Sequence, residues 1–299
     1  MHPPRHHIVV SRCLIALCTA LLATSAIAAA PTFVVTVDPA IRQEPFTGRV
    51  YVFFASTNPQ PRTGPDWFHP EPFIAKEISD LKPGEPVRFS ADDPAVLAFP
   101  KPLADLELTG LKAQAVARFN PLERQVGTGP GNGYGATISF DNGADEVGLA
   151  IDRLIEARPY EETRWGKLID VPSKLLSDFH GRKVTLRGTV ILPASYYDQP
   201  QRRYPTILTI PGFGGDHRID PVREPVPEQN EAGVEFLRVM LDPNCSLGHH
   251  TFADSDNNGP VGEAFITEFL PAFDREYRSI GEPTARFVTG HSSGGWSSL

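Results

Sequence analysis

The feature that most constrains this chain is a short segment rich in glycine and serine near the end of the sequence. The pattern G-x-S-x-G is matched by Gly290-His291-Ser292-Ser293-Gly294. In this pattern a strand runs into a helix through one strained turn, and the two glycines leave room for neighbouring segments. A loose loop is the alternative, but residues 286–289 suit a short buried strand and Trp296 suits a packed helix start. The order strand, turn, helix therefore predicts an elbow that presents Ser292 as a nucleophile.

The first half of the chain is predicted to be all-β. With 30 prolines and 25 glycines in 299 residues, the composition favours short strands and turns over long helices. Between residues 29 and 158, turn clusters separate short segments rich in β-branched and aromatic residues, which predicts a β-sandwich domain. The segments interpreted as strands are 33–37, 48–55, 87–89, 111–119, 136–140 and 147–155. The Gly-rich stretch 127–135 lacks the G-x-G-x-x-G spacing and is interpreted as a hairpin loop.

The second half follows a junction over residues 159–183, which holds one short helix from Ser173 to Phe179 that ends at Gly181. From residue 184 onward the chain is predicted to be α/β with a parallel sheet. Aromatic residues at helical spacing predict a helix over 262–278, kinked at Pro271. The apolar run 206–210 is typical of a strand buried on both faces. The segments interpreted as strands are 183–192, 206–210, 234–241 and 286–289.

Residues 1–28 are interpreted as an export signal. They contain two arginines, no acidic residue and a long apolar run, and Ala26-Ile27-Ala28 offers a cleavage site, so the mature protein is expected to start near Ala29. An uncleaved membrane anchor is the alternative, but the run is short and is interrupted by Thr and Ser. The protein is therefore expected in the periplasm or outside the cell, with no stable membrane span. Cys245 is then its only cysteine, which excludes an internal disulfide.

A second glycine-rich segment, Pro211-Gly212-Phe213-Gly214-Gly215-Asp216-His217, leaves the predicted strand 206–210. A serine that attacks an ester generates an oxyanion, which needs hydrogen-bond donors already in place. In an elbow of this kind one donor is the N–H of the residue after the nucleophile, here Ser293, and the other comes from a Gly-rich loop after an earlier strand. We therefore expect Phe213 or Gly214 to supply the second donor. An ordinary strand-to-helix turn is the alternative.

The elbow, the loop Gly212-Phe213-Gly214-Gly215 and the stretch from His250 to Pro260 together resemble the esterase branch of the α/β-hydrolases, which includes esterase D-like and enterochelin-esterase-like proteins. The resemblance covers residues from about 184 to 299, and the β-sandwich ahead of them is similar by architecture only. It implies hydrolysis of a carboxylic ester through an acyl-enzyme on Ser292, with no metal and no organic cofactor. It also implies that the acid and histidine of the triad follow the elbow, so they are expected beyond Leu299 and the α/β-hydrolase fold here is expected to be partial. Iron-siderophore, acetyl-carbohydrate and feruloyl esters are all open as small-molecule substrates.

An alternative base lies upstream, in loops near the carboxyl ends of the predicted strands, where the sites of open sheets gather. The residues concerned are His217, His249, His250, Asp216, Asp254 and Asp256. Shaping a pocket, or capping the helix that begins near Pro260, is their favoured role. Residues 254–259 also match the first half of a calcium-binding EF-hand loop, but Phe265 stands where the twelfth position requires Glu, so no metal is predicted.

Two classes of function follow from these patterns. The first is a secreted ester hydrolase, and the second is a ligand-binding protein that uses the β-sandwich while the hydrolase half is incomplete or inactive. The formal net charge of −8 argues against nucleic acid as a partner in either case. The correctly spaced glycines and serine of the elbow favour the hydrolase.

Overall fold

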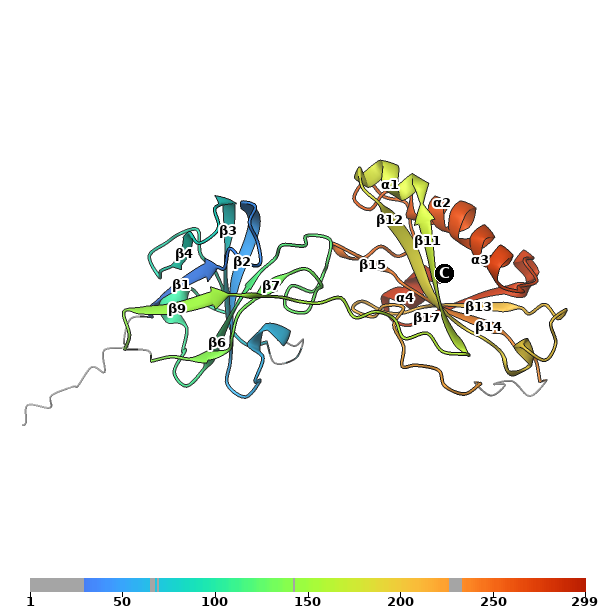
Figure 1. Ribbon diagram of the computed structural model, residues 1–299, viewed down its shortest axis with the longest axis horizontal. Coiled ribbons are helices and arrows are strands. Elements are labelled where there is room, and N and C mark those ends of the chain that lie inside the picture. The colour runs from blue at the N-terminus through green and yellow to red at the C-terminus, as the bar shows by residue number, and fades with distance from the viewer. Residues whose placement is uncertain (1–29, 65–67, 69, 142, 226–232) are drawn as a thin grey trace, which may run out of the picture.

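The computed structural model describes residues 30–64, 68, 70–141, 143–225 and 233–299. The predicted export signal, residues 1–28, and the expected mature start at Ala29 lie outside the described residues. The described chain forms two lobes, each with its own hydrophobic core (Figure 1). Among the described residues, no helix has the length and apolar character needed to cross a membrane.

The N-terminal lobe consists of two sheets that enclose one core. A three-stranded sheet has the order β4-β1-β9, and a seven-stranded sheet has the order β10-β7-β6-β2-β3-β5, with β8 paired to β6. In β1 every second residue is buried, which places Phe33 and Val35 in the core. The Phe33 ring meets the Phe54 ring of the other sheet edge-on, with centroids 5.1 Å apart. The strands are β1 (Thr32–Val37), β2 (Phe46–Ala55), β3 (Phe73–Leu81), β4 (Pro86–Phe89), β5 (Leu97–Phe99), β6 (Lys112–Ala117), β7 (Gly133–Tyr134), β8 (Ile138–Ser139), β9 (Glu146–Ile151) and β10 (Arg153–Leu154).

The strands predicted in this lobe are confirmed, although the segment 136–140 pairs only over β8 and the segment 147–155 is split into β9 and β10. The Gly-rich stretch lies between the antiparallel strands β6 and β7 and continues into β7, so most of it is a hairpin loop as predicted. Strand β3, which pairs with β2 along most of its length, was not predicted from the sequence. Lys76, Glu77 and Asp80 interrupt the apolar character of β3, because both faces of the strand are partly exposed between Lys76 and Asp80.

The C-terminal lobe is built on a five-stranded sheet of order β11-β12-β14-β13-β17. Strands β14, β13 and β17 are parallel, but β11 and β12 pair antiparallel to their neighbours, so the expectation of a parallel sheet is correct for only part of it. The large strands are β11 (Gly166–Ser173), β12 (Val184–Ile191), β13 (Thr206–Ile210), β14 (Leu237–Leu241) and β17 (Arg286–Gly290), and β15 (Asn244–Cys245) and β16 (Gly248–His249) form a small separate pair.

The interpretation of residues 159–183 as a junction with one short helix is incomplete, because strand β11 lies inside this range. It is an edge strand, and Pro172 is tolerated there because one side of an edge strand needs no ladder hydrogen bond. The helix α1 (Lys174–His180) follows it as predicted. The Ser173 side chain accepts a hydrogen bond from Leu176 N–H, and Gly181 ends the helix at a φ of 63°.

Helices cover one face of this sheet and form the core with it. After α2 (Val261–Ala264), the chain passes through a π-helical turn (Phe265–Phe269) into α3 (Leu270–Glu276). The break predicted at Pro271 therefore takes the form of a widened turn just before the proline, which has no N–H to offer an α-helical bond. Phe269 and Phe273 are fully buried against the sheet.

The expectation that residues 206–210 are buried on both faces is wrong. Along β13 burial alternates, and Ile207 and Thr209 are only half-buried because the helices α1, α2 and α3 cover the opposite face. The expectation that residues 286–289 form a buried strand is also wrong: β17 lies at the sheet edge among the described residues, with the Phe287 and Val288 side chains about half exposed. A final short helix, α4 (Ser293–Ser297), lies beside β17 and β13. Its Trp296 side chain is exposed, so the expectation that Trp296 packs at the start of this helix is wrong.

Candidate active site

Ser292 occupies the strained turn that the sequence predicts. It lies between the end of β17 and the start of α4, with φ 53° and ψ −121°. A non-glycine residue at positive φ is uncommon, and this combination lies outside the populated left-handed helical region. Strain of this kind persists only where the surroundings impose it, and it concentrates at functional sites. Ser292 is exposed, and among the residues that the structure describes none hydrogen-bonds to its hydroxyl.

The two glycines of the elbow are required by close backbone packing. A Cβ on Gly290 would lie 2.2 Å from the carbonyl carbon and oxygen of Gly294. A Cβ on Gly294 would lie 1.9 Å from the carbonyl oxygen of Ile210 in β13. These neighbours are backbone atoms, which cannot rotate away as the end of a side chain could. The strand, the turn and the helix are therefore pressed together so tightly that only glycine fits two residues before and after Ser292.

The glycine-rich loop after β13 lies directly against the elbow. A Cβ on Gly212 would be 3.2 Å from Ser292 Cβ and 3.1 Å from the carbonyl oxygen of His291. The Gly215 N–H donates to the Gly212 carbonyl at 3.0 Å, and Gly214 has φ 93°, as the third residue of a type II turn requires. Residues 212–215, called the glycine turn below, thus place Phe213 and Gly214 beside the elbow.

Ser293 and His291 flank the serine in different ways. Ser293 is the first residue of α4, so its N–H is one of those that lack an acceptor inside the helix. The carbonyl of His291 accepts from the Gly294 N–H at 2.8 Å, while the residue itself is exposed to solvent. The structure therefore brings together at one turn the residues that the sequence predicts for the nucleophile and its surroundings.

Among the upstream histidines, His217 forms a pair that the sequence analysis missed. Its Nδ1 lies 2.8 Å from Oδ2 of Asp242, the residue that directly follows β14, and His217 is buried. Burial alone would raise the pKa of the Asp242 carboxyl, but the hydrogen bond and charge of His217, with hydrogen bonds from Asn244, bring that pKa below its usual value. The signal that could have found it is an acidic residue at the carboxyl end of a buried strand, next to a loop that carries His.

Neither of the other two histidines is arranged as a base for Ser292. His249 Nδ1 accepts from the Thr251 N–H at 3.0 Å, so its Nε2 carries the proton and donates to the Pro211 carbonyl at 2.9 Å. His250 is buried, and its Nδ1 accepts from the Phe252 N–H at 3.1 Å. The role of His249 is to hold the start of the glycine turn in place.

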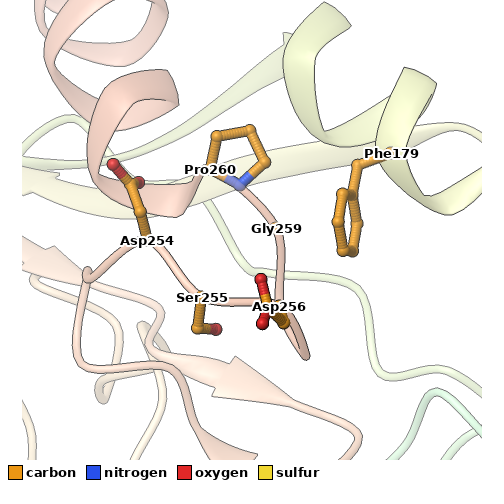
Figure 2. Close-up of a pocket in the computed structure, with 6 residues that line it drawn as sticks. All are labelled: Phe179, Asp254, Ser255, Asp256, Gly259 and Pro260. Atoms are coloured by element: carbon orange, nitrogen blue, oxygen red, sulfur yellow. The ribbon is translucent and has the colours of Figure 1, made fainter.

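Two of the three aspartates, Asp216 and Asp254, serve local structure. Asp216 accepts from the backbone and guanidinium of Arg218. Oδ1 of Asp254 accepts from Gly262 N–H at 2.7 Å and Glu263 N–H at 3.1 Å, which caps α2 as the sequence analysis favoured. Asp256 lines an open hollow of about 370 Å³, and Figure 2 shows it on the loop opposite Phe179 of α1. Within the described ranges no three His, Cys, Asp or Glu side chains converge as metal ligands would.

Acidification is expected to destabilise the protein through His250. Burial, with His249 nearby, lowers the pKa of the His250 imidazole to about 4, against about 6.5 in an unfolded chain. Between these values the unfolded state binds a proton that the folded state does not, so stability falls as the pH drops through this window. From pH 7.5 to 5 the loss is about 2 kcal/mol.

Urea unfolding of wild type and His250→Gln at both pH values measures this loss. Gln can still accept the Phe252 N–H but does not titrate, so the loss of stability on acidification should be about 2 kcal/mol smaller in this variant. An equal loss in the two proteins would contradict the assignment to His250.

Comparisons with known proteins give partial structural likenesses. No protein-family model and no curated protein sequence matches the chain. A ferulic acid esterase is 24% identical over 45% of this chain and 53% of its own, with a TM-score of 0.33. An S-formylglutathione hydrolase from Agrobacterium tumefaciens is 15% identical over 44% of this chain and 50% of its own, with a TM-score of 0.32. A ferulic acid esterase from Anaeromyces mucronatus is 18% identical over 48% of this chain and 54% of its own, with a TM-score of 0.32.

The aligned region thus spans about half the length of each of these three proteins. At TM-scores near 0.3 the likenesses carry no functional argument. A functional proposal for this chain therefore depends on the geometry of the elbow around Ser292.

Proposed function

We propose that this protein is an exported serine hydrolase that cleaves a carboxylic ester through an acyl-enzyme on Ser292. The observation that carries the proposal is the backbone of Ser292, which is held at φ 53° and ψ −121° between a strand and a helix by glycine contacts. This arrangement fixes the backbone of a serine that is exposed to solvent. In this proposal the C-terminal lobe is the hydrolase domain and has an α/β-hydrolase fold. The N-terminal lobe, which we interpret as a β-sandwich, precedes it.

In the proposed reaction, Ser292 Oγ attacks the carbonyl carbon of the ester while a base accepts the hydroxyl proton. The carbonyl oxygen becomes an oxyanion, which the N–H groups of Ser293 and of Phe213 or Gly214 stabilise. Collapse of this intermediate breaks the bond to the alcohol, which leaves with a proton, and the acyl group stays on Ser292. Water then attacks the acyl-enzyme, releases the carboxylic acid and restores the serine.

The resemblance seen in the sequence implies that the base follows the elbow in the chain. His217 is the alternative within the described residues, because Asp242 holds its Nδ1 as the acid of a triad holds its histidine. We expect the base to be another residue, since no hydrogen bond joins His217 to Ser292 among the described contacts. Loss of Ser292 reactivity in His217→Gln, in a variant that remains folded, would instead assign the role to His217.

A fluorophosphonate probe tests the proposal directly, because such probes react with activated serines. Trypsin cleaves after Arg286, and no lysine or arginine lies between Phe287 and Leu299, so Ser292 falls in one peptide with Ser293, Ser297 and Ser298. Tandem mass spectrometry of that peptide should place the adduct on Ser292. An adduct on another serine, or none in protein that turns over p-nitrophenyl esters, would refute the assignment.

Export is proposed from residues 1–28, the basic and acid-free start followed by an apolar run. Intact-mass measurement of protein from a secreting host should give a chain that begins near Ala29. Mature protein that retains these residues would overturn this part of the proposal. The expected substrates are small esters of the siderophore, acetyl-carbohydrate or feruloyl type.

A further inference from the structure

One loop of the N-terminal lobe contacts the glycine turn in the C-terminal lobe. This loop, residues 118–132 between β6 and β7, is called the bridging loop here, and Figure 1 shows it reaching toward the C-terminal lobe. The Arg124 guanidinium lies over the Phe213 ring, with its carbon 4.9 Å from the ring centroid. Nη2 of Arg124 also approaches the carbonyl oxygen of Gly214 at 3.4 Å. Arg124, about ninety positions upstream in the chain, thus contacts Phe213 and Gly214, the two residues proposed to supply the second oxyanion donor.

The Phe213 ring also lies against β16. A Cβ on Gly248 would lie 2.3 Å from Cε2 of Phe213, so the ring rests on the bare backbone of β16. Gly248 has φ 125°, a conformation that favours glycine, so the close approach and the backbone both require this residue. The neighbouring His249 donates to the Pro211 carbonyl. Phe213, although about half exposed, therefore contacts both Arg124 and β16, at the point where the turn lies beside Ser292.

The bridging loop is ordered by its own polar contacts. The Arg118 guanidinium donates to the carbonyls of Pro121 at 3.1 Å and Glu123 at 3.0 Å. Asn132 is fully buried, donates to the Val126 carbonyl at 2.9 Å and accepts from the backbone N–H of Asn120. These contacts hold the backbone on both sides of Arg124, so its guanidinium is presented by a fixed segment rather than by a mobile loop tip.

We propose that Arg124 is a positioning residue of the active site, through which the N-terminal lobe fixes the glycine turn beside Ser292. The inference rests on the proposed function. An oxyanion hole works only if its donors are already aimed when charge develops, and a turn with glycine at three of its four positions is flexible by itself. The stacked guanidinium restrains Phe213, and its contact with the Gly214 carbonyl restrains the peptide that follows.

Three single variants of the full chain test this role. Arg124→Ala removes the stack and the donor, while Arg124→Lys keeps the charge but loses the planar face. Arg42→Ala is the matched control, because Arg42 also lies over a phenylalanine, with its guanidinium carbon 4.9 Å from the Phe119 centroid, and donates to the carbonyls of Glu44 and Pro45. The control removes the same kinds of contact at Phe119, the second residue of the bridging loop, and leaves the contacts of Arg124 with Phe213 and Gly214 in place.

The first measurement is hydrogen–deuterium exchange of the peptide that contains residues 212–215, which needs no catalytic activity. Exchange should be at least about tenfold faster in Arg124→Ala and intermediate in Arg124→Lys. The second is the rate of fluorophosphonate labelling of Ser292, which should fall about 10- to 100-fold in Arg124→Ala. Arg42→Ala should match wild type in both measurements.

The two measurements separate failure of this inference from failure of the proposed function. Unchanged exchange at residues 212–215 in Arg124→Ala overturns the positioning role whatever the labelling rate. Faster exchange with an unchanged labelling rate overturns the link between the turn and Ser292. If wild-type Ser292 takes no label, the proposed function fails, and the exchange data alone decide whether Arg124 fixes the turn.

Discussion

Replacing Ser292 by Ala is expected to abolish fluorophosphonate labelling and to lower ester turnover by about 10³-fold or more. The acyl-enzyme route needs the hydroxyl oxygen itself, and loss of a nucleophilic serine removes that route completely. A small residual rate can survive, because an intact oxyanion hole still stabilises attack by water. The fold should be unaffected, since the described contacts give the Ser292 hydroxyl no hydrogen bond. Turnover of p-nitrophenyl esters and gel detection of the probe measure the two effects.

Ser293→Ala is the matched control for this experiment. It removes the neighbouring hydroxyl but keeps the backbone N–H that we propose as an oxyanion donor, so both labelling and turnover should stay within about threefold of wild type. Ester turnover in Ser292→Ala equal to wild type would exclude Ser292 as the nucleophile. If neither wild type nor Ser292→Ala turned over esters, the ligand-binding alternative, in which the N-terminal lobe carries the function, would gain support.

Replacing Gly294 by Ala is expected to destabilise the C-terminal lobe by about 3 kcal/mol. The added Cβ would lie 1.9 Å from the carbonyl oxygen of Ile210, well inside contact distance. Ile210 belongs to β13, which pairs with both β14 and β17, so relieving the clash means moving the centre of the sheet or the start of α4. Either movement also displaces Ser292. Urea unfolding should show the lost stability, and Ser292 labelling should fall even where the protein remains folded.

Gly295→Ala is the control for this second experiment, because Gly295 lies next to Gly294 in the same helix. A Cβ there would lie 3.4 Å from the nearest atom, the carbonyl oxygen of Gly290, which is ordinary contact. Alanine also favours a helix over glycine, so we expect this variant to unfold within about 1 kcal/mol of wild type. A Gly294→Ala protein as stable as Gly295→Ala would show that the backbone packing at the elbow is looser than described.

Features that depend on neighbouring residues could be predicted from the sequence. The strained turn at Ser292 follows from two glycines at fixed spacing around it, and the ends of α1 follow from the capping residue Ser173 and the left-handed Gly181. Strands β1, β2, β13 and β17 follow from runs of β-branched and aromatic residues, whose preference for extended backbone is local. Edge strand β11 escaped the same reasoning, because Lys167, Asp170 and Pro172 interrupt its apolar character.

The surroundings of Ser292 were decided only by the tertiary structure. Asp242 meets His217, and Arg124 meets Phe213 across the two lobes, although these pairs are separated by long stretches of chain. Nothing local to Arg124 distinguishes it from the other arginines of the N-terminal lobe, such as Arg42. Its contact depends on how the bridging loop folds and on where the C-terminal lobe presents the glycine turn. Propensity acts over a few residues and so determines the elbow, whereas contacts between distant segments form only when separately folded surfaces pack together.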